Sequence, residues 1–144
     1  MSSPMKFVIG LVAALLVIFL YHGPLGGGTA LVDRIEAGAQ ANVARTEVPG
    51  IGVALGRDPL SRTATLSGPA DNIQRTGMGE MPGLNQIVEE SPGVAGIRWA
   101  DEGGSGAFMP LLGEALLAGL VAYLLGYLIG SRMFGRNRNR SYLD

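Results

Sequence analysis

Two long apolar runs, one near each end of the chain, constrain this sequence more than any motif between them. The first covers residues 5–21 and the second residues 111–129. A helix of about 20 apolar residues spans the ~30 Å hydrocarbon core of a bilayer. Apolar residues make up 47% of the 144-residue chain, an ordinary fraction, so their concentration in two blocks matters more than their number. The sequence therefore predicts two transmembrane helices with one small domain between them.

The pattern predicts six consecutive parts. They are an N-terminal transmembrane helix (1–21), a linker (22–29), a mixed domain (30–102), a Gly-rich linker (103–109), a second transmembrane helix (110–134) and a basic tail (135–144).

The first apolar run has a second interpretation. Lys6, the apolar stretch after it and the small residues around Thr29 match the layout of a cleaved signal peptide. However, the stretch from Leu20 to Thr29 is long for a cleavage region and contains Pro24 and three glycines. We therefore favour a retained helix and keep cleavage as the alternative.

Charge is distributed unevenly around the two runs. Residues 22–106 contain ten acidic residues against six arginines, so this segment is acidic. Basic residues near a membrane span stay on the cytoplasmic side. We therefore expect a bacterial inner-membrane protein with both termini in the cytoplasm and its domain in the periplasm. The residues that we assign to topology and to anionic lipid headgroups, rather than to nucleic acid, are Arg132, Arg136, Arg138 and Arg140.

Between the two runs, helical spacing alternates with strand-like alternation of apolar and polar residues. Thr29 is a plausible cap for the first helix, and Pro49-Gly50 ends it. A turn cluster around Asp58 joins two segments with a period of two, which predicts a β-hairpin. Helices are expected over residues 31–43 and 84–90, and strands over residues 51–55, 63–67 and 94–99. The predicted fold class is α+β, in the order α-β-β-α-β.

This order, with the phrases at its joints, resembles the BON domain, a small periplasmic α+β module. The strand at residues 63–68 ends in Leu-Ser-Gly, and residues 91–97 place Pro-Gly-Val before the last strand, as the family does. The chain departs from the family at residues 77–83, where glycines interrupt the expected second helix. The resemblance implies contacts with phospholipid or other envelope components and supplies no catalytic residues.

The polar residues form no recognisable catalytic, cofactor-binding or metal-binding constellation. The chain has no cysteine, and its one histidine, His22, lies at the predicted membrane boundary, where we read it as a linker residue. Asp58 and Asp71 occupy positions typical of turns, which we favour over acid–base or metal chemistry. We therefore expect no enzymatic activity and no cofactor.

Small residues recur every fourth position along the second run and so share one face of the predicted helix. They are Ala118, Ala122, Gly126 and Gly130. In lipid, helices associate by close van der Waals packing, which small residues permit. The stripe predicts a helix–helix interface, either with the first helix, which has small residues at Gly10, Ala13 and Ala14, or with another membrane protein.

Two polar residues within the second run are candidates for specific contacts. Glu114 lies about one turn inside the outer end, where it reaches headgroup water or contacts a partner. Tyr123 lies deeper, so its hydroxyl requires a hydrogen-bond partner from a neighbouring helix.

These features favour an accessory or scaffolding subunit that docks onto a larger membrane assembly through its second helix and its domain. The alternative is an envelope-maintenance module whose domain binds phospholipid or another envelope component.

Overall fold

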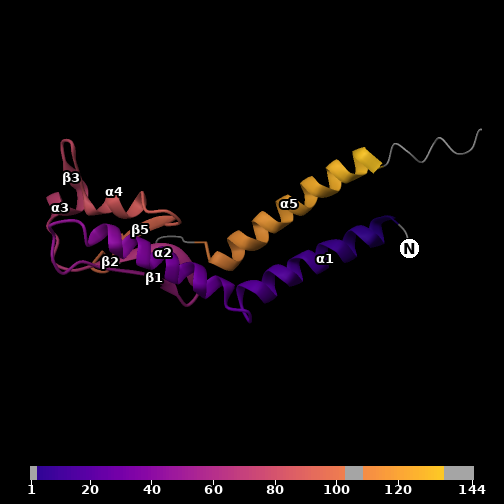
Figure 1. The fold of residues 1–144 in the computed structure, drawn as a ribbon, viewed down its shortest axis with the longest axis horizontal. Coiled ribbons are helices and arrows are strands. Elements are labelled where there is room, and N and C mark those ends of the chain that lie inside the picture. Colours follow the sequence, from indigo (N-terminus) through magenta and orange to yellow (C-terminus); the bar gives the residue numbers. More distant parts are fainter. Residues whose placement is uncertain (1–2, 103–108, 135–144) are drawn as a thin grey trace, which may run out of the picture.

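The computed structural model describes residues 3–102 and 109–134 and has two parts, a small α+β domain and a pair of long helices that projects from it. The paired helices are α1 (Ser3–His22) and α5 (Leu111–Phe134). They run side by side in opposite directions, so the first residues of α1 and the last residues of α5 lie at the end far from the domain (Figure 1).

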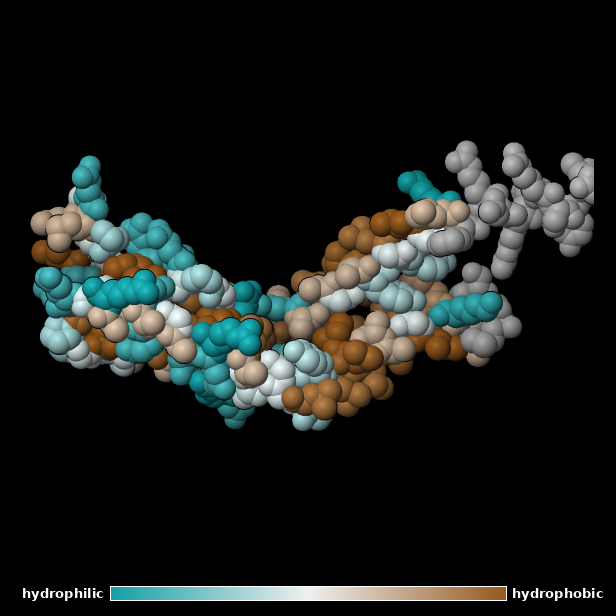
Figure 2. All heavy atoms as spheres, viewed as in Figure 1, coloured by the Kyte–Doolittle hydropathy of each residue, from teal (hydrophilic) through white to brown (hydrophobic). Residues whose placement is uncertain are grey.

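Both helices of the pair are long and apolar enough to cross a membrane, as the sequence predicts. The apolar windows extend over Pro4–His22 and Leu111–Met133, which correspond to about 28 and 34 Å of helix. Their apolar side chains face outward, and Figure 2 shows hydrophobic residues over the helix pair and hydrophilic ones over much of the domain. The cytoplasmic position of both ends stays a prediction.

The predicted linker over residues 22–29 is wrong in extent, since α1 continues through His22 and α2 (Gly27–Val43) begins at Gly27. Gly26 adopts a left-handed conformation with φ 72°, which glycine accepts without strain. Thr29 does not cap the helix but lies inside it, and its hydroxyl donates to the Gly26 carbonyl at 3.1 Å. Three consecutive glycines thus permit a turn tighter than the sequence pattern indicated.

The domain contains a three-stranded sheet in the order β1-β2-β5, formed by β1 (Gly52–Arg57), β2 (Leu60–Ser67) and β5 (Gly96–Trp99). Strands β1 and β2 form the predicted antiparallel hairpin, with Val53 opposite Leu66. Strand β5 pairs in parallel with β2 and places Trp99 beside Leu66. The class is mixed α+β, as predicted.

Additional elements lie between β2 and the second helix of the domain, α4 (Leu84–Glu89). They are α3 (Asn72–Thr76), β3 (Gly77–Met78) and β4 (Met81–Pro82), and the two strands form a short antiparallel hairpin. Gly77 has φ 81°, a conformation that favours glycine. The glycines that interrupt the expected helix therefore build this hairpin, which projects at the end of the domain far from α1 and α5 (Figure 1).

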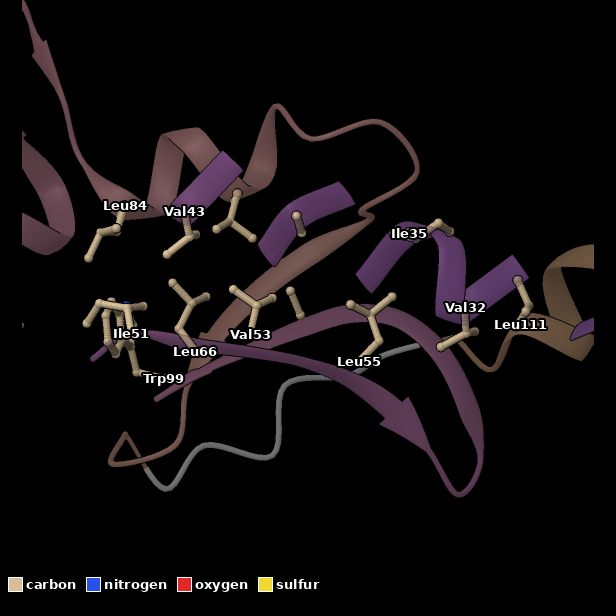
Figure 3. Close-up of a cluster of buried hydrophobic side chains, with 13 residues drawn as sticks. Val32, Ile35, Val43, Ile51, Val53, Leu55, Leu66, Leu84, Trp99 and Leu111 are labelled. Carbon is tan, nitrogen blue, oxygen red and sulfur yellow. The ribbon is translucent and has the colours of Figure 1, made fainter. Parts of the chain in front are cut away.

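The core of the domain lies between the sheet and helices α2 and α4 (Figure 3). Its largest fully buried side chains are Leu66, Leu84, Val32, Val43 and Val88. Leu111, the first residue of α5, also belongs to this cluster and is 5% exposed. The second long helix therefore begins inside the core of the domain.

Side chains of α2 close the free edge of β1. The amide oxygen of Gln40 accepts a hydrogen bond from the N–H of Val53 at 2.8 Å, and a carboxylate oxygen of Glu36 accepts one from the N–H of Leu55 at 2.7 Å. Unpaired edge N–H groups are a template for strand addition by other chains. At this edge, α2 removes that template.

Candidate membrane-embedded interface

An aromatic cluster connects α1 and α5 near the end far from the domain. The Tyr123 hydroxyl donates a hydrogen bond to the backbone carbonyl of Phe7 at 2.7 Å. The Phe7 ring lies 5.3 Å from the Tyr123 ring and 4.7 Å from the Tyr127 ring, centroid to centroid. The neighbouring helix that the sequence requires for the Tyr123 hydroxyl is therefore α1 of the same chain.

A glycine on each helix makes room for this contact. A Cβ atom placed on Gly10 of α1 would lie 2.5 Å from the Tyr123 hydroxyl oxygen, and one placed on Gly119 of α5 would collide with the Ile18 side chain. The side of α5 that meets α1 therefore runs from Gly119 to Tyr123 and Tyr127, residues spaced four apart on one helical face.

The small-residue stripe lies beside this face and is left open. Ala118, Ala122 and Gly126 are exposed. Among the described residues, no atom lies within 4 Å of a Cβ atom built on Gly126 or Gly130, other than those of neighbouring chain positions. Packing of α1 against α5 therefore does not use the stripe, and docking of another protein against it stays a prediction.

Glu114 is paired within the chain. One of its carboxylate oxygens lies 2.6 Å from Nε of Arg62 on β2, and Nη1 of Arg62 donates to the Gly93 carbonyl at 3.2 Å. The side chains of Arg62 and Glu114 are 33% and 24% exposed. This ion pair fixes the first turn of α5 to the sheet, a role that the sequence did not reveal because the partners are far apart in the chain.

The basic residues assigned to topology lie at and beyond the end of α5. Arg132 is exposed in the last turn of the helix. Arg136, Arg138 and Arg140 lie outside the described residues.

The tip of the domain carries an apolar surface that the sequence pattern missed. Ile73, Met78 and Met81 are 57%, 64% and 71% exposed. They border a cavity of ≈ 310 Å³ whose wall includes Leu84 and Ile87. The signal was obscured because a hairpin of two-residue strands has no periodic pattern in the sequence.

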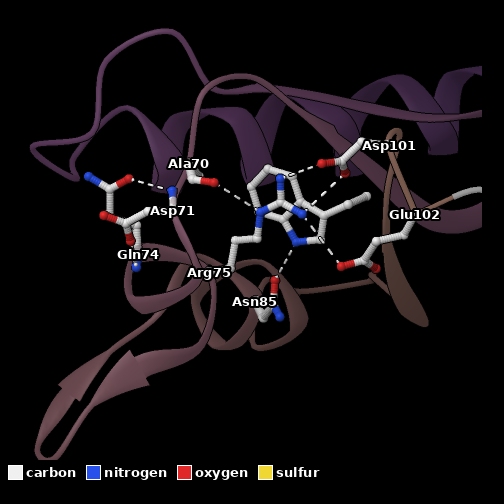
Figure 4. Close-up of polar contacts among 8 residues, drawn as sticks. Ala70, Asp71, Gln74, Arg75, Asn85, Asp101 and Glu102 are labelled. Atoms are coloured by element: carbon white, nitrogen blue, oxygen red, sulfur yellow. Dashed lines mark hydrogen bonds and ion pairs between the residues drawn. The ribbon is translucent and has the colours of Figure 1, made fainter.

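A charged cluster supports the domain beside this tip (Figure 4). The guanidinium of Arg75 lies 4.0 Å from the centroid of the Trp99 ring and pairs with Asp101 at 2.6 Å. The ion pair raises the pKa of Arg75 and lowers that of Asp101. The side-chain oxygen of Asn85 accepts a hydrogen bond from the indole N–H of Trp99 at 2.8 Å. The Trp99 ring is therefore held by Arg75 over its face and by Asn85 at its edge.

The aspartates and the histidine considered for chemistry are not brought together. Asp71 caps α3, where its carboxylate accepts the N–H of Gln74 at 2.7 Å, and Asp58 lies in the β1–β2 turn before Pro59. The His22 ring packs against Gly28 at the start of α2. In the part of the chain that the structure describes, no group of three or more His, Cys, Asp or Glu side chains is placed to hold a metal ion.

Comparison of the chain with protein-family models, curated proteins and solved structures returned no match.

Proposed function

We propose that this protein is an accessory or scaffolding subunit of the bacterial inner membrane, which docks onto a larger membrane protein assembly. The observation that carries the proposal is the open stripe from Ala118 to Gly130, beside a face of α5 that already holds α1. Gly10 and Gly119 already allow α1 and α5 to approach each other closely. The small residues of the stripe are therefore not needed for the contact between these two helices.

The physical reason for docking at the stripe is the nature of the bilayer. Lipid tails are as apolar as leucine, so burying leucines between helices gains little there. Smooth faces allow backbones to approach closely and gain dispersion energy over a long contact. In α5 that smooth surface is the stripe, whereas the opposite side carries exposed leucines such as Leu117 and Leu128.

The tip of the domain supplies a second contact with the assembly. Exposed, contiguous apolar side chains on a domain mark interaction sites, and methionine adapts to the shape of its partner. Ile73, Met78 and Met81 meet this description at the end far from the membrane helices. The protein would thus hold its partner at two levels, within the bilayer and beyond it.

The domain itself is proposed to be a BON-like module on the periplasmic side. Its core elements follow the order α2, β1, β2, α4 and β5, which agrees with the resemblance in the sequence. The insertion of α3 and the β3–β4 hairpin is the part that departs from it. The basic residues close to the outer ends of the two long helices support this orientation.

The test is co-purification of the full chain from native membranes in mild detergent, followed by a native gel. The wild-type protein should migrate with other polypeptides, and the double variant Gly126→Ile, Gly130→Ile should lose them because the added side chains hold a partner helix away. Leu128→Phe adds bulk on the other side of α5 and is the matched control, which should keep the partners. A wild-type chain that migrates alone, or a double variant that keeps all its partners, would refute the proposal.

A further inference from the structure

A small apolar crevice lies where α1, α2 and α5 meet, between the two long helices and the domain. Its volume is ≈ 330 Å³, at the lower end of the range for small-molecule sites. Residues from all three helices form its walls: Val17 and Ile18 of α1, Leu31 of α2, and Leu111 and Ala115 of α5.

The glycines at the start of α2 shape this crevice. The Tyr21 ring lies against Gly27 and the His22 ring against Gly28, so closely that a Cβ atom on either glycine would collide with them. Leu111 is 5% exposed and closes the crevice toward the core of the domain. The crevice is therefore a consequence of the tight α1–α2 turn.

The chemistry of the walls excludes a strongly polar ligand. The lining side chains are aliphatic except for those of Tyr21 and His22, at the last two positions of α1. Burying a charged or hydrogen-bonding group against aliphatic carbon without a partner costs several kcal/mol. A suitable ligand has a hydrocarbon portion within the crevice and a polar portion beside Tyr21 and His22.

We propose that the crevice holds one acyl chain of a phospholipid from the bilayer leaflet next to the domain, with the headgroup beside Tyr21 and His22. The inference depends on the proposed membrane insertion of α1 and α5. Val17 is 62% exposed on α1, so the wall of the crevice continues into the surface that faces lipid. The bilayer is thus the adjacent source of a ligand with one apolar and one polar end. The crevice volume of ≈ 330 Å³ is smaller than one turn of a helix of ~10 Å diameter and ~5.4 Å pitch, about 420 Å³, so a helix does not fit.

The test uses the full chain reconstituted in vesicles of phosphatidylethanolamine and phosphatidylglycerol, re-extracted in mild detergent, washed and weighed by native mass spectrometry. The wild-type chain should retain one phospholipid. Ala115→Phe fills the crevice from α5 and should lower lipid occupancy about tenfold or more, a difference of ~1.4 kcal/mol. Leu117→Phe makes the same kind of change on an exposed side of α5 and should retain the lipid.

A second variant shows whether loss of lipid from Ala115→Phe results from filling of the crevice or from misfolding. Val17→Trp fills the crevice from α1 at an exposed position, where a larger side chain is accommodated without disturbing the core, and it should also lose the lipid. A wild-type chain that carries no phospholipid, or filled variants that retain it as well as Leu117→Phe does, would overturn the inference. Extraction of the chain from the vesicles by alkaline carbonate would instead refute membrane insertion itself, so the two failures are distinguishable.

Discussion

The domain and the helix pair arrange the same kinds of side chain in opposite ways. Leu66 of the domain is fully buried, whereas Leu125 of α5 is 54% exposed. The most apolar stretches of α1 and α5 contain no buried residues. The domain encloses its apolar residues behind polar ones, as water requires. The helix pair exposes its apolar side chains, which in water would leave a large apolar surface and which an apolar environment such as a bilayer accommodates. The contrast is compatible with a domain folded in water and two helices that are long and apolar enough to cross a membrane.

The two regions also differ in how they use polar contacts. The domain satisfies its edge N–H groups with Glu36 and Gln40 and supports Trp99 with Arg75. The helix pair relies on glycine contacts, aromatic packing and the hydrogen bond of Tyr123 to a backbone carbonyl. The elements of the domain are therefore held in position by many small contacts, and the two helices of the pair by a few.

The largest effect is expected from matched truncations in the two regions. Leu66→Ala should lower the free energy of unfolding of the domain by ~2–5 kcal/mol, because it leaves a cavity in a packed core. Leu125→Ala, at an exposed position on α5, should leave the domain unchanged. Denaturant titration of the chain in detergent, followed through the fluorescence of Trp99, the only tryptophan, measures both. An equal loss of stability in the two variants would show that the two regions do not differ in how they bury leucine.

A smaller effect is expected from the charged cluster beside the tip. Arg75→Ala removes both the ion pair with Asp101 and the contact over the Trp99 ring, so it should lower the denaturation midpoint by less than Leu66→Ala does. The same titration measures it. Arg98→Ala, which removes only a hydrogen bond to Thr65 on an exposed strand position, is the control and should change the midpoint less.

The ion pair also gives the domain a defined response to acid. Hydrogen bonding to Arg75 lowers the pKa of Asp101 in the folded state below its value in the unfolded chain. The ion pair therefore stabilises the folded domain fully at pH values above the pKa of Asp101 in the unfolded chain, ~3.9. This stabilisation is lost as the pH falls through the lower pKa of Asp101 in the folded domain. Asp101→Asn should abolish this component, so the difference in stability between wild type and variant should shrink on acidification below about pH 4. A constant difference would contradict the pairing.

The connection between the two regions is expected to be weaker still. Glu114→Gln removes the charge that holds Arg62, and because both side chains are partly exposed, the loss should be below ~1 kcal/mol. Amide hydrogen exchange should rise in the first turn of α5 and stay unchanged in α2. Faster exchange throughout the domain would show that the ion pair supports the fold rather than the attachment of α5.

The smallest effect is expected within the helix pair. Tyr123→Phe keeps the ring contacts with Phe7 and removes only the hydrogen bond, which in membranes is worth ~0.6 kcal/mol on average. Cross-linking between engineered cysteines on α1 and α5 should decrease slightly. Gly10→Ile, which drives a side chain into Tyr123, is the comparison and should decrease it strongly.

Periodic patterns predicted the elements with the longest regular signals. Alternation along residues 51–55 and 63–67 is realised as β1 and β2, and the two apolar runs are α1 and α5. The β3–β4 hairpin was not predicted, because strands of two residues cannot show a period. The predicted interruption by glycine was correct, but glycines alone do not specify the turn that replaces a helix.

The sequence predicted only those features of the candidate interface that depend on the spacing of residues within a single helix. Helical spacing places Ala118 to Gly130 together, but it does not say which face of α5 meets α1. That choice depends on Phe7 fitting against Tyr123 and Tyr127, contacts between residues more than a hundred positions apart. The Arg62–Glu114 pair was missed for the same reason.

We propose that α1 and α5 cross one bilayer and return the chain to the side where it started. Because the chain contains no cysteine, single cysteines can be introduced at Ser3, at Glu80 in the β3–β4 turn, and at Ser141, and probed in intact cells with a thiol reagent that does not cross the inner membrane. We expect labelling at position 80 from the periplasm and protection at positions 3 and 141 until the cells are opened. Labelling of either terminal position in intact cells, or protection of all three, would rule out this topology.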